Sequence, residues 1–183
     1  MLPVLLNGQR PIDLEDPLFV RLVNCATPAE RAALVERFGW RDGAGDPTDA
    51  EIDELARHLE LVAEFLLDPL GASLGDEAGA QELREAGPEI LRIMLEDVAA
   101  KPRFRERGGT KRFVFEVTTL TDFTVLEVAA AVEAKASGRR CEHCNNMFLY
   151  GPLTGRRSHG KYCGDRCRVA AMRVRKADQE GDL

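Results

Sequence analysis

The sequence predicts an α+β fold, in which a mostly helical N-terminal domain with a small β-hairpin precedes a small cysteine-containing C-terminal segment. Three observations lead to this prediction. The chain has 183 residues, which suffices for one main hydrophobic core and a small appendage. Apolar residues recur at helical spacing over most of residues 1–137, whereas alternation with period two is confined to one short stretch. Four of the five cysteines fall within residues 138–177.

The first elements are a short strand and a helix. Residues 3–6 are apolar and precede the turn dipeptide Asn7-Gly8, which indicates a strand or hairpin arm. After Pro17, apolar residues at helical spacing predict a helix that extends to Ala26. Cys25 lies within this spacing, and we expect it to be a small buried side chain rather than a reactive one.

Two capping boxes mark the next helices. Thr27 is followed by a proline and then by Glu30, and Thr48 is followed three residues later by Glu51. This pattern predicts that a helix begins directly after each threonine. The second helix carries a long amphipathic stripe and is expected to end before Pro69.

A further helix, a hairpin and a last body helix follow. Pro88 is expected to open a helix that ends before Pro102. Residues 103–119 alternate with period two around Gly108-Gly109, which predicts a β-hairpin. Residues 121–136 return to helical spacing.

Charge divides the chain. The formal net charge is −6, and an evenly acidic surface would repel nucleic acid. However, residues 138–176 carry 10 Lys and Arg against 2 Asp and Glu, whereas residues 1–137 carry 15 against 26. We therefore expect a helical body (residues 1–137), a basic module (residues 138–177) and an acidic tail (residues 178–183).

Four cysteines of the basic module have the spacing of a metal site. Two residues separate Cys141 from Cys144, and three separate Cys163 from Cys167. In a chain without a visible export signal, such pairs are typical of zinc ligands rather than of disulfides. Four thiolates can surround one structural Zn²⁺ at about 2.3 Å and stabilise a segment that has few apolar residues. Two disulfides, or free thiols, are the alternative.

The two cysteine pairs are expected to be held differently. The first pair fits a tight knuckle turn, because Asn145 and Asn146 behind it tolerate a positive φ. The second pair is expected to begin a helix, whose first turn directs residues four apart to one side. A knuckle and a helix N-terminus that share one zinc form a treble-clef-like zinc finger. His143 or His159 could replace one cysteine as a ligand.

Basic residues lie close to this expected zinc site. On the expected helix they gather mainly on the side away from the metal, where they could contact phosphates. A solvated face, or one that docks on the acidic body or a protein partner, is the alternative. The candidate nucleic-acid-binding residues are Arg156, Arg157, Lys161, Arg166, Arg168, Arg173, Arg175 and Lys176.

The predicted hairpin is a second basic segment. It contains Arg103, Arg105, Arg107, Lys111 and Arg112. We expect these residues to protect an exposed strand edge, although they could also form a rail for phosphates.

No sequence feature indicates an enzyme. The body lacks GxGxxG, P-loop, HExxH and GxSxG patterns. A zinc ion with four cysteine ligands also has no open position for water or substrate. We therefore predict no catalytic residues.

The order of these parts resembles a bacterial family with an N-terminal ABATE domain and a C-terminal CGNR-type zinc finger, described as stress-induced transcriptional regulators. The motif-level similarity lies in the finger: the four cysteines, Phe148, the Arg156-Arg157 loop and the basic helix. The resemblance implies that the four cysteines bind zinc. The Cys-Gly-Asn-Arg step itself is absent, because Arg168 follows Cys167. If that step carries the family's nucleic-acid contact, the contact is altered or lost here.

These observations predict a zinc-dependent, DNA-binding transcriptional regulator. The helical body is expected to sense a small-molecule effector or to form a homodimer. The absence of a long apolar run predicts no membrane contact and a cytoplasmic location. The alternative function is a protein-interaction module in which the zinc finger is purely structural.

Overall fold

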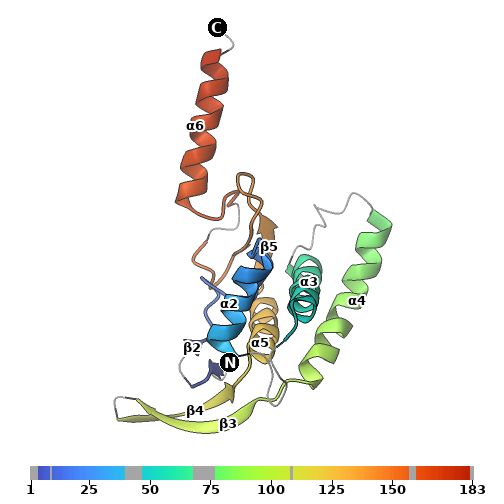
Figure 1. Cartoon of the computed structure of the whole chain (residues 1–183), viewed down its shortest axis with the longest axis vertical. Helices are drawn as coiled ribbons and strands as arrows, with labels where there is room; N and C mark the ends of the chain where they lie inside the picture. Colours follow the sequence, from blue (N-terminus) through green and yellow to red (C-terminus); the bar gives the residue numbers. More distant parts are fainter. Residues whose placement is uncertain are drawn as a thin grey trace.

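The computed structural model describes residues 4–8, 10–39, 47–67, 77–107, 109–156 and 160–181. Within them the α+β fold is confirmed, with mixed sheets, helices and a C-terminal β-hairpin beside a four-cysteine cluster (Figure 1). The helices are α1 (Leu18–Asn24), α2 (Pro28–Phe38), α3 (Asp49–Leu67), α4 (Glu77–Glu96), α5 (Leu120–Glu133) and α6 (Asp165–Gly181). The strands are β1 (Val4–Leu6), β2 (Arg10–Pro11), β3 (Lys101–Arg107), β4 (Thr110–Val117), β5 (Ser137–Arg140) and β6 (Met147–Tyr150).

The predicted N-terminal strand and the later hairpin meet in one sheet. Its strand order is β2-β1-β4-β3, and β1 pairs parallel with β4 while the other neighbours pair antiparallel. The turn at Asn7-Gly8 is confirmed, with φ values of 49° and 68°. The hairpin is confirmed as well, and Gly109 in its turn has a φ of 75°; Gly108 lies outside the described residues.

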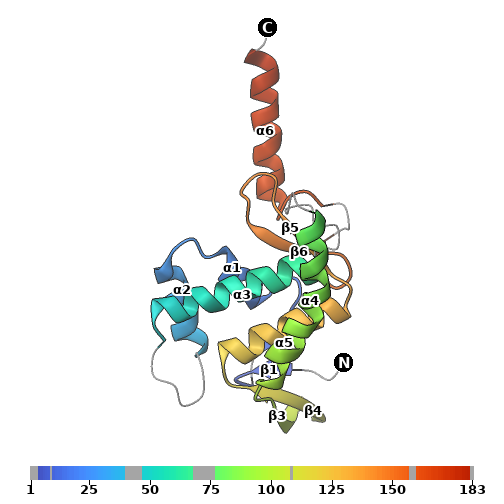
Figure 2. The ribbon, with the colours of Figure 1, turned by 90° about the vertical axis from the view of Figure 1, so that its right-hand side faces the viewer.

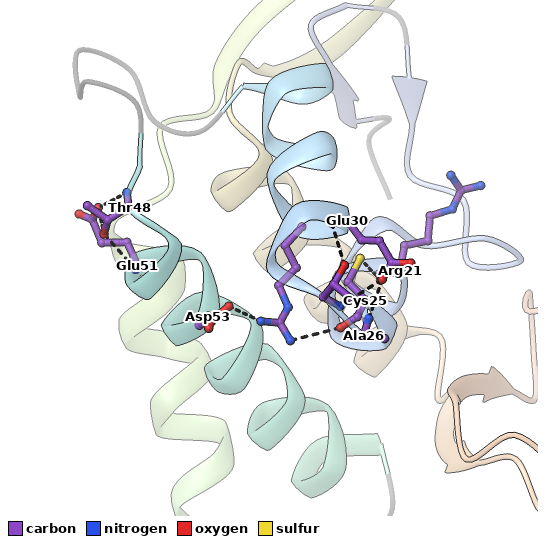
Figure 3. A network of polar contacts seen from close by, with 9 residues as sticks. Arg21, Cys25, Ala26, Glu30, Thr48, Glu51 and Asp53 are labelled. Carbon is purple, nitrogen blue, oxygen red and sulfur yellow. Dashed lines mark hydrogen bonds and ion pairs between the residues drawn. The ribbon is translucent and has the colours of Figure 1, made fainter.

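Both predicted capping boxes are present, and Figure 3 shows the one formed by Thr48 and Glu51. Thr27 accepts a hydrogen bond from the Glu30 backbone N–H at 3.3 Å, and the Glu30 carboxylate accepts one from the Thr27 N–H at 3.2 Å. Thr48 and Glu51 form the same reciprocal pair at 3.3 and 2.8 Å. These bonds satisfy backbone donors that the first helical turn leaves without partners.

The expected start of the fourth helix at Pro88 is wrong. Helix α4 begins at Glu77, and Pro88 lies in its interior. A proline in a helix removes one backbone hydrogen bond. The nine residues from Glu77 to Glu85 include three glutamates, two alanines, a glutamine, a leucine and an arginine, and such good helix formers extend the helix to both sides of the proline. Pro102 follows α4 as expected but lies within the edge strand β3, a position that proline tolerates.

The core of the helical body forms where α1, α3 and α5 pack together (Figures 1 and 2). Phe19, Leu22, Leu59 and Phe123 are fully buried there. Cys25 follows α1 and is half-buried, with its thiol 3.3 Å from the Arg21 carbonyl oxygen. Among the described helices, none combines the length and the hydropathy that a bilayer span requires.

Candidate metal centre

The first cysteine pair lies in a knuckle between two short strands. Strands β5 and β6 pair antiparallel, and Cys141 follows β5 directly. The Cys141 N–H donates to the Asn146 carbonyl at 2.9 Å, and the Asn145 N–H donates back to the Cys141 carbonyl at 2.9 Å. Asn145 has a φ of 60°, as the sequence predicts for this turn.

The second pair spans the start of α6. Cys167 lies in the first turn of the helix, whereas Cys163 lies two residues before it. The helix therefore begins slightly later than the spacing predicts. The Arg168 N–H donates to the Gly164 carbonyl at 3.1 Å, so Cys163 ends the incoming loop and Cys167 belongs to the helix.

Hydrogen bonds to backbone carbonyls bring the two pairs together. The Glu142 N–H in the knuckle donates to the Lys161 carbonyl at 3.1 Å. The Arg139 guanidinium donates to the Gly160 carbonyl at 3.1 Å. These bonds hold the loop before Cys163 against the knuckle.

The four sulfur atoms form one cluster. The Sγ atoms of Cys141, Cys144, Cys163 and Cys167 all lie within 4.8 Å of one another. The Cys144–Cys163 distance is 3.6 Å and the Cys163–Cys167 distance is 3.4 Å. Four sulfurs at about 2.3 Å from a tetrahedral zinc would be about 3.8 Å apart, so the cluster fits one metal ion. The cluster does not include His143, and His159 lies outside the described residues.

Electrostatics at the cluster favour a bound cation. Burial raises the pKa of the Cys141 thiol, but backbone N–H groups of Cys144, Cys163 and His143 outweigh it, so its pKa is about 6. Burial and hydrogen bonds from the neighbouring sulfurs raise the pKa of Cys163. A thiolate at Cys141 thus opposes ionisation of Cys163, and a metal cation removes this conflict because it binds all the sulfurs as thiolates.

The knuckle is anchored to the helical body through Asn24 at the end of α1. The Asn24 amide donates to the Met147 carbonyl and accepts from the Met147 N–H, both at 2.7 Å. Met147 and Leu149 are buried in the same core as the helices, and Arg140 forms an ion pair with Glu60 of α3. The sequence gives no local signal of this anchor, because Asn24 lies 123 residues before Met147.

The predicted nucleic-acid-binding residues of the loops are partly engaged. The Arg156 guanidinium lies 5.7 Å from the Phe148 ring centroid and donates to the Leu149 carbonyl at 3.4 Å. Lys161 is exposed and lies 3.3 Å from Glu142. Arg157 lies outside the described residues.

The predicted residues of the helix are exposed to solvent. Helix α6 projects away from the body, with its N-terminal end at the cysteine cluster (Figures 1 and 2). Arg166, Arg168, Arg173 and Arg175 are all exposed. Arg168 pairs with Asp165 at 3.1 Å, and Arg175 donates to the Tyr162 hydroxyl at 3.1 Å. Lys176 belongs to α6, but its side chain is not among those described.

The helical body also contains an open cavity that the sequence does not reveal. Its volume is about 590 Å³. Residues of α3, α5 and the end of α4, with the segment directly after α4, line it, among them Leu55, His58, Met94, Asp97 and Val125.

In comparisons with known proteins, no family model, curated protein or solved structure matches the chain.

Proposed function

We propose that this protein is a zinc-dependent DNA-binding transcriptional regulator, not an enzyme, in which α6 contacts the phosphate backbone. The observation that carries this proposal is the position of α6. Its first turn holds Cys167 of the cysteine cluster, and the helix, which extends from the body, carries four exposed arginines, two in the first turn and two further along.

Zn²⁺ is the proposed metal because the ligand set contains four sulfurs and closes the site. Thiolate ligands select soft or borderline metals, and a tetrahedral four-sulfur set is typical of structural zinc. The bound ion would neutralise thiolate charge and fix the start of α6 to the knuckle. The direction in which the arginines point would then be set by the metal.

Charge supports a polyanionic partner. Arg166 and Arg173 have no ion-pair partner among the described residues. They lie on a helix that extends away from the acidic helical body (Figure 2). Cations on such a helix can approach DNA while the body remains at a distance, which lowers the repulsion between the body and the phosphates.

Binding of the zinc-loaded chain to a mixed-sequence DNA duplex tests the proposal. Fluorescence anisotropy at low and near-physiological salt should show an affinity that falls steeply as salt rises, because phosphate contacts release counterions. The double variant Arg166→Ala/Arg173→Ala should weaken binding of every sequence and reduce the slope of log affinity against log salt by about 2.

The matched control is Arg57→Ala, which removes one exposed arginine from α3 in the acidic body. It should bind duplex as the unmodified chain does. Absence of binding at low salt, or equal loss in the control and in the α6 variant, would contradict a role for α6.

One observation favours a protein partner instead. Val169, Met172 and Val174 of α6 are exposed apolar residues, and exposed apolar patches often mark protein interfaces. A shallow salt dependence, together with unchanged duplex affinity in the α6 double variant, would support this second function.

We further propose that the body cavity holds the small-molecule effector and that the protein acts in the cytoplasm. The cavity volume is within the range of about 300–1,000 Å³ that is usual for ligand sites.

A further inference from the structure

The β3–β4 hairpin extends from the sheet as an arm. Within the part of the chain that the structure describes, strand β1 pairs with β4 only at Phe115–Val117, so β3 is the one pairing partner of the outer half of β4, and β3 is an edge strand. The tip of the hairpin reaches beyond the helices, at the end of the molecule opposite α6 (Figure 1). We call residues 101–107 and 109–114 the arm.

The register separates two kinds of side chain onto the two faces of the arm. Residues directly opposite each other in an antiparallel pair share a face, and successive residues alternate. Phe104 is opposite Phe113, so one face is aromatic; Arg105 is opposite Arg112, so the other face is cationic. Arg103 lies on this cationic face too, opposite Val114.

The aromatic face is a ladder of rings that runs from the core to solvent. The centroids of Phe104 and Phe113 are 5.4 Å apart, those of Phe113 and Phe115 are 5.5 Å apart, and both ring pairs meet edge to face. The inner end continues to the buried Val117, whereas Phe104 at the outer end is 76% exposed. The edge strand of the arm thus presents a solvent-exposed aromatic ring.

The cationic face has unmatched positive charge. Arg105 and Arg112 are like charges directly opposite each other, a pairing that destabilises a hairpin. A salt bridge to Glu116 at 2.5 Å neutralises the charge of Arg105. Arg103 and Arg112 are exposed and have no ion-pair partner among the described residues. An anion at this face would relieve the repulsion.

Edge protection explains only part of this arrangement. If two β3 edges paired antiparallel about Phe104, Arg103 would meet Arg105, and Pro102 lacks an N–H to donate, so the edge does resist self-pairing. Protection does not account for a large exposed ring on that edge, because an apolar ring invites contact there.

A single-stranded nucleic acid matches both faces. Its phosphates are anionic, and its unpaired bases offer flat faces that stack on aromatic rings. A duplex keeps its bases stacked inside, and the carboxylates of an acidic peptide offer no flat face to the ring. We propose that the arm is a second nucleic-acid site that binds single strands, with Arg103 and Arg112 on phosphates and Phe104 against a base.

The probe is a labelled, mixed-sequence single-stranded DNA of about 12 nucleotides, which is long enough for one small site. Its fluorescence anisotropy is measured as the full zinc-loaded chain is added, at a series of salt concentrations. Arg103→Ala/Arg112→Ala should weaken binding about tenfold and reduce the salt slope by about 1.4. Phe104→Ala should also weaken binding about tenfold but leave the slope unchanged, because a stacking contact releases no counterions. Arg57→Ala serves as the control and should bind like the unmodified chain.

The outcomes separate this site from the α6 site. Phe104→Ala could loosen the arm, so the arginine variant, which keeps the ring pair, tests the site independently. Single-strand affinity that is equal in the unmodified chain and both arm variants would overturn the proposal, as would no binding at low salt. Loss of duplex binding alone in Arg166→Ala/Arg173→Ala would leave the arm proposal standing. Loss of both affinities in that variant, with the arm variants unaffected, would leave only the α6 site.

Discussion

At the scale of single residues, Glu127 is the least expected feature of the body. It lies on α5 and is fully buried. Its Oε2 accepts a hydrogen bond from the Phe19 N–H at 2.9 Å, and its Oε1 has no partner in the described part of the chain. Burial raises its pKa from an ordinary 4.5 to about 8, although the Leu18 and Phe19 N–H groups and Arg10 act in the opposite direction.

This pKa predicts that stability falls as pH rises. The folded chain holds the Glu127 proton more tightly than the unfolded chain, so its contribution is complete below about pH 4.5 and is lost as pH rises to about 8. Glu127→Gln cannot ionise and should lack this loss. The free energy of unfolding of Glu127→Gln minus that of the unmodified chain should therefore grow by roughly 2 to 3 kcal/mol between about pH 6 and 9. Urea denaturation at each pH measures this difference.

Glu133→Gln on the same helix is the control, because Glu133 is exposed. Parallel pH profiles for Glu127→Gln and the unmodified chain would show that Glu127 stays ionised in the folded protein.

Residues whose role depends on near neighbours are predictable from the sequence. The spacing of the four cysteines predicts a metal site, and a glutamate three residues after Thr27 and Thr48 predicts a capping box at each threonine. The roles of Glu127 and Asn24 depend on partners 108 and 123 residues away. No local pattern encodes those contacts, because packing of the whole chain creates them.

At the scale of elements, α6 is a 17-residue helix that extends from the body (Figure 1), and most of its side chains described between Val169 and Arg175 are exposed. A helix of this length is only slightly longer than the roughly 12–15 residues below which isolated helices are marginal in water, because the first turn is costly to form. Asp165 in the first turn and its pair with Arg168 contribute only tenths of a kcal/mol. We infer that metal binding at Cys163 and Cys167 fixes the first turn and thereby supports the helix.

Cys163→Ser should therefore lose both metal and helix. Zinc content, measured by atomic emission, should fall from about one ion per chain to near zero. The helical circular dichroism of α6 should disappear, while the helical body stays folded. Cys25→Ser is the matched control, since Cys25 lies outside the cluster. Full zinc occupancy in Cys163→Ser would contradict the ligand assignment.

Elements with local start signals were predictable, and elements defined by distant pairing were not. The capping boxes locate α2 and α3. The helix start predicted at Pro88 was wrong, because a proline can also lie inside a helix when good helix formers precede it. The parallel pairing of β1 with β4 joins segments more than 100 residues apart, and strand alternation reveals a face but not a partner.

At the scale of the whole molecule, the two basic projections lie at opposite ends of an acidic body. Helix α6 leaves one end, and the arm leaves the other (Figure 1). One straight duplex along the molecule would pass the acidic body, which favours two separate contacts rather than one continuous track. The knuckle links the body to α6, so the position of α6 depends on how firmly the knuckle docks.

Asn24 is the polar centre of that docking, and its removal should loosen the metal site from a distance. Asn24→Ala leaves the Met147 N–H and carbonyl without partners, which should reduce the free energy of unfolding by about 2 to 4 kcal/mol in urea denaturation. Transfer of zinc to a chromogenic chelator should become faster, because an undocked knuckle opens more often. Asn146→Ala, at the exposed neighbour of Met147, should change neither quantity. Lower stability with an unchanged rate of zinc transfer would mean that the body and the metal centre are energetically independent.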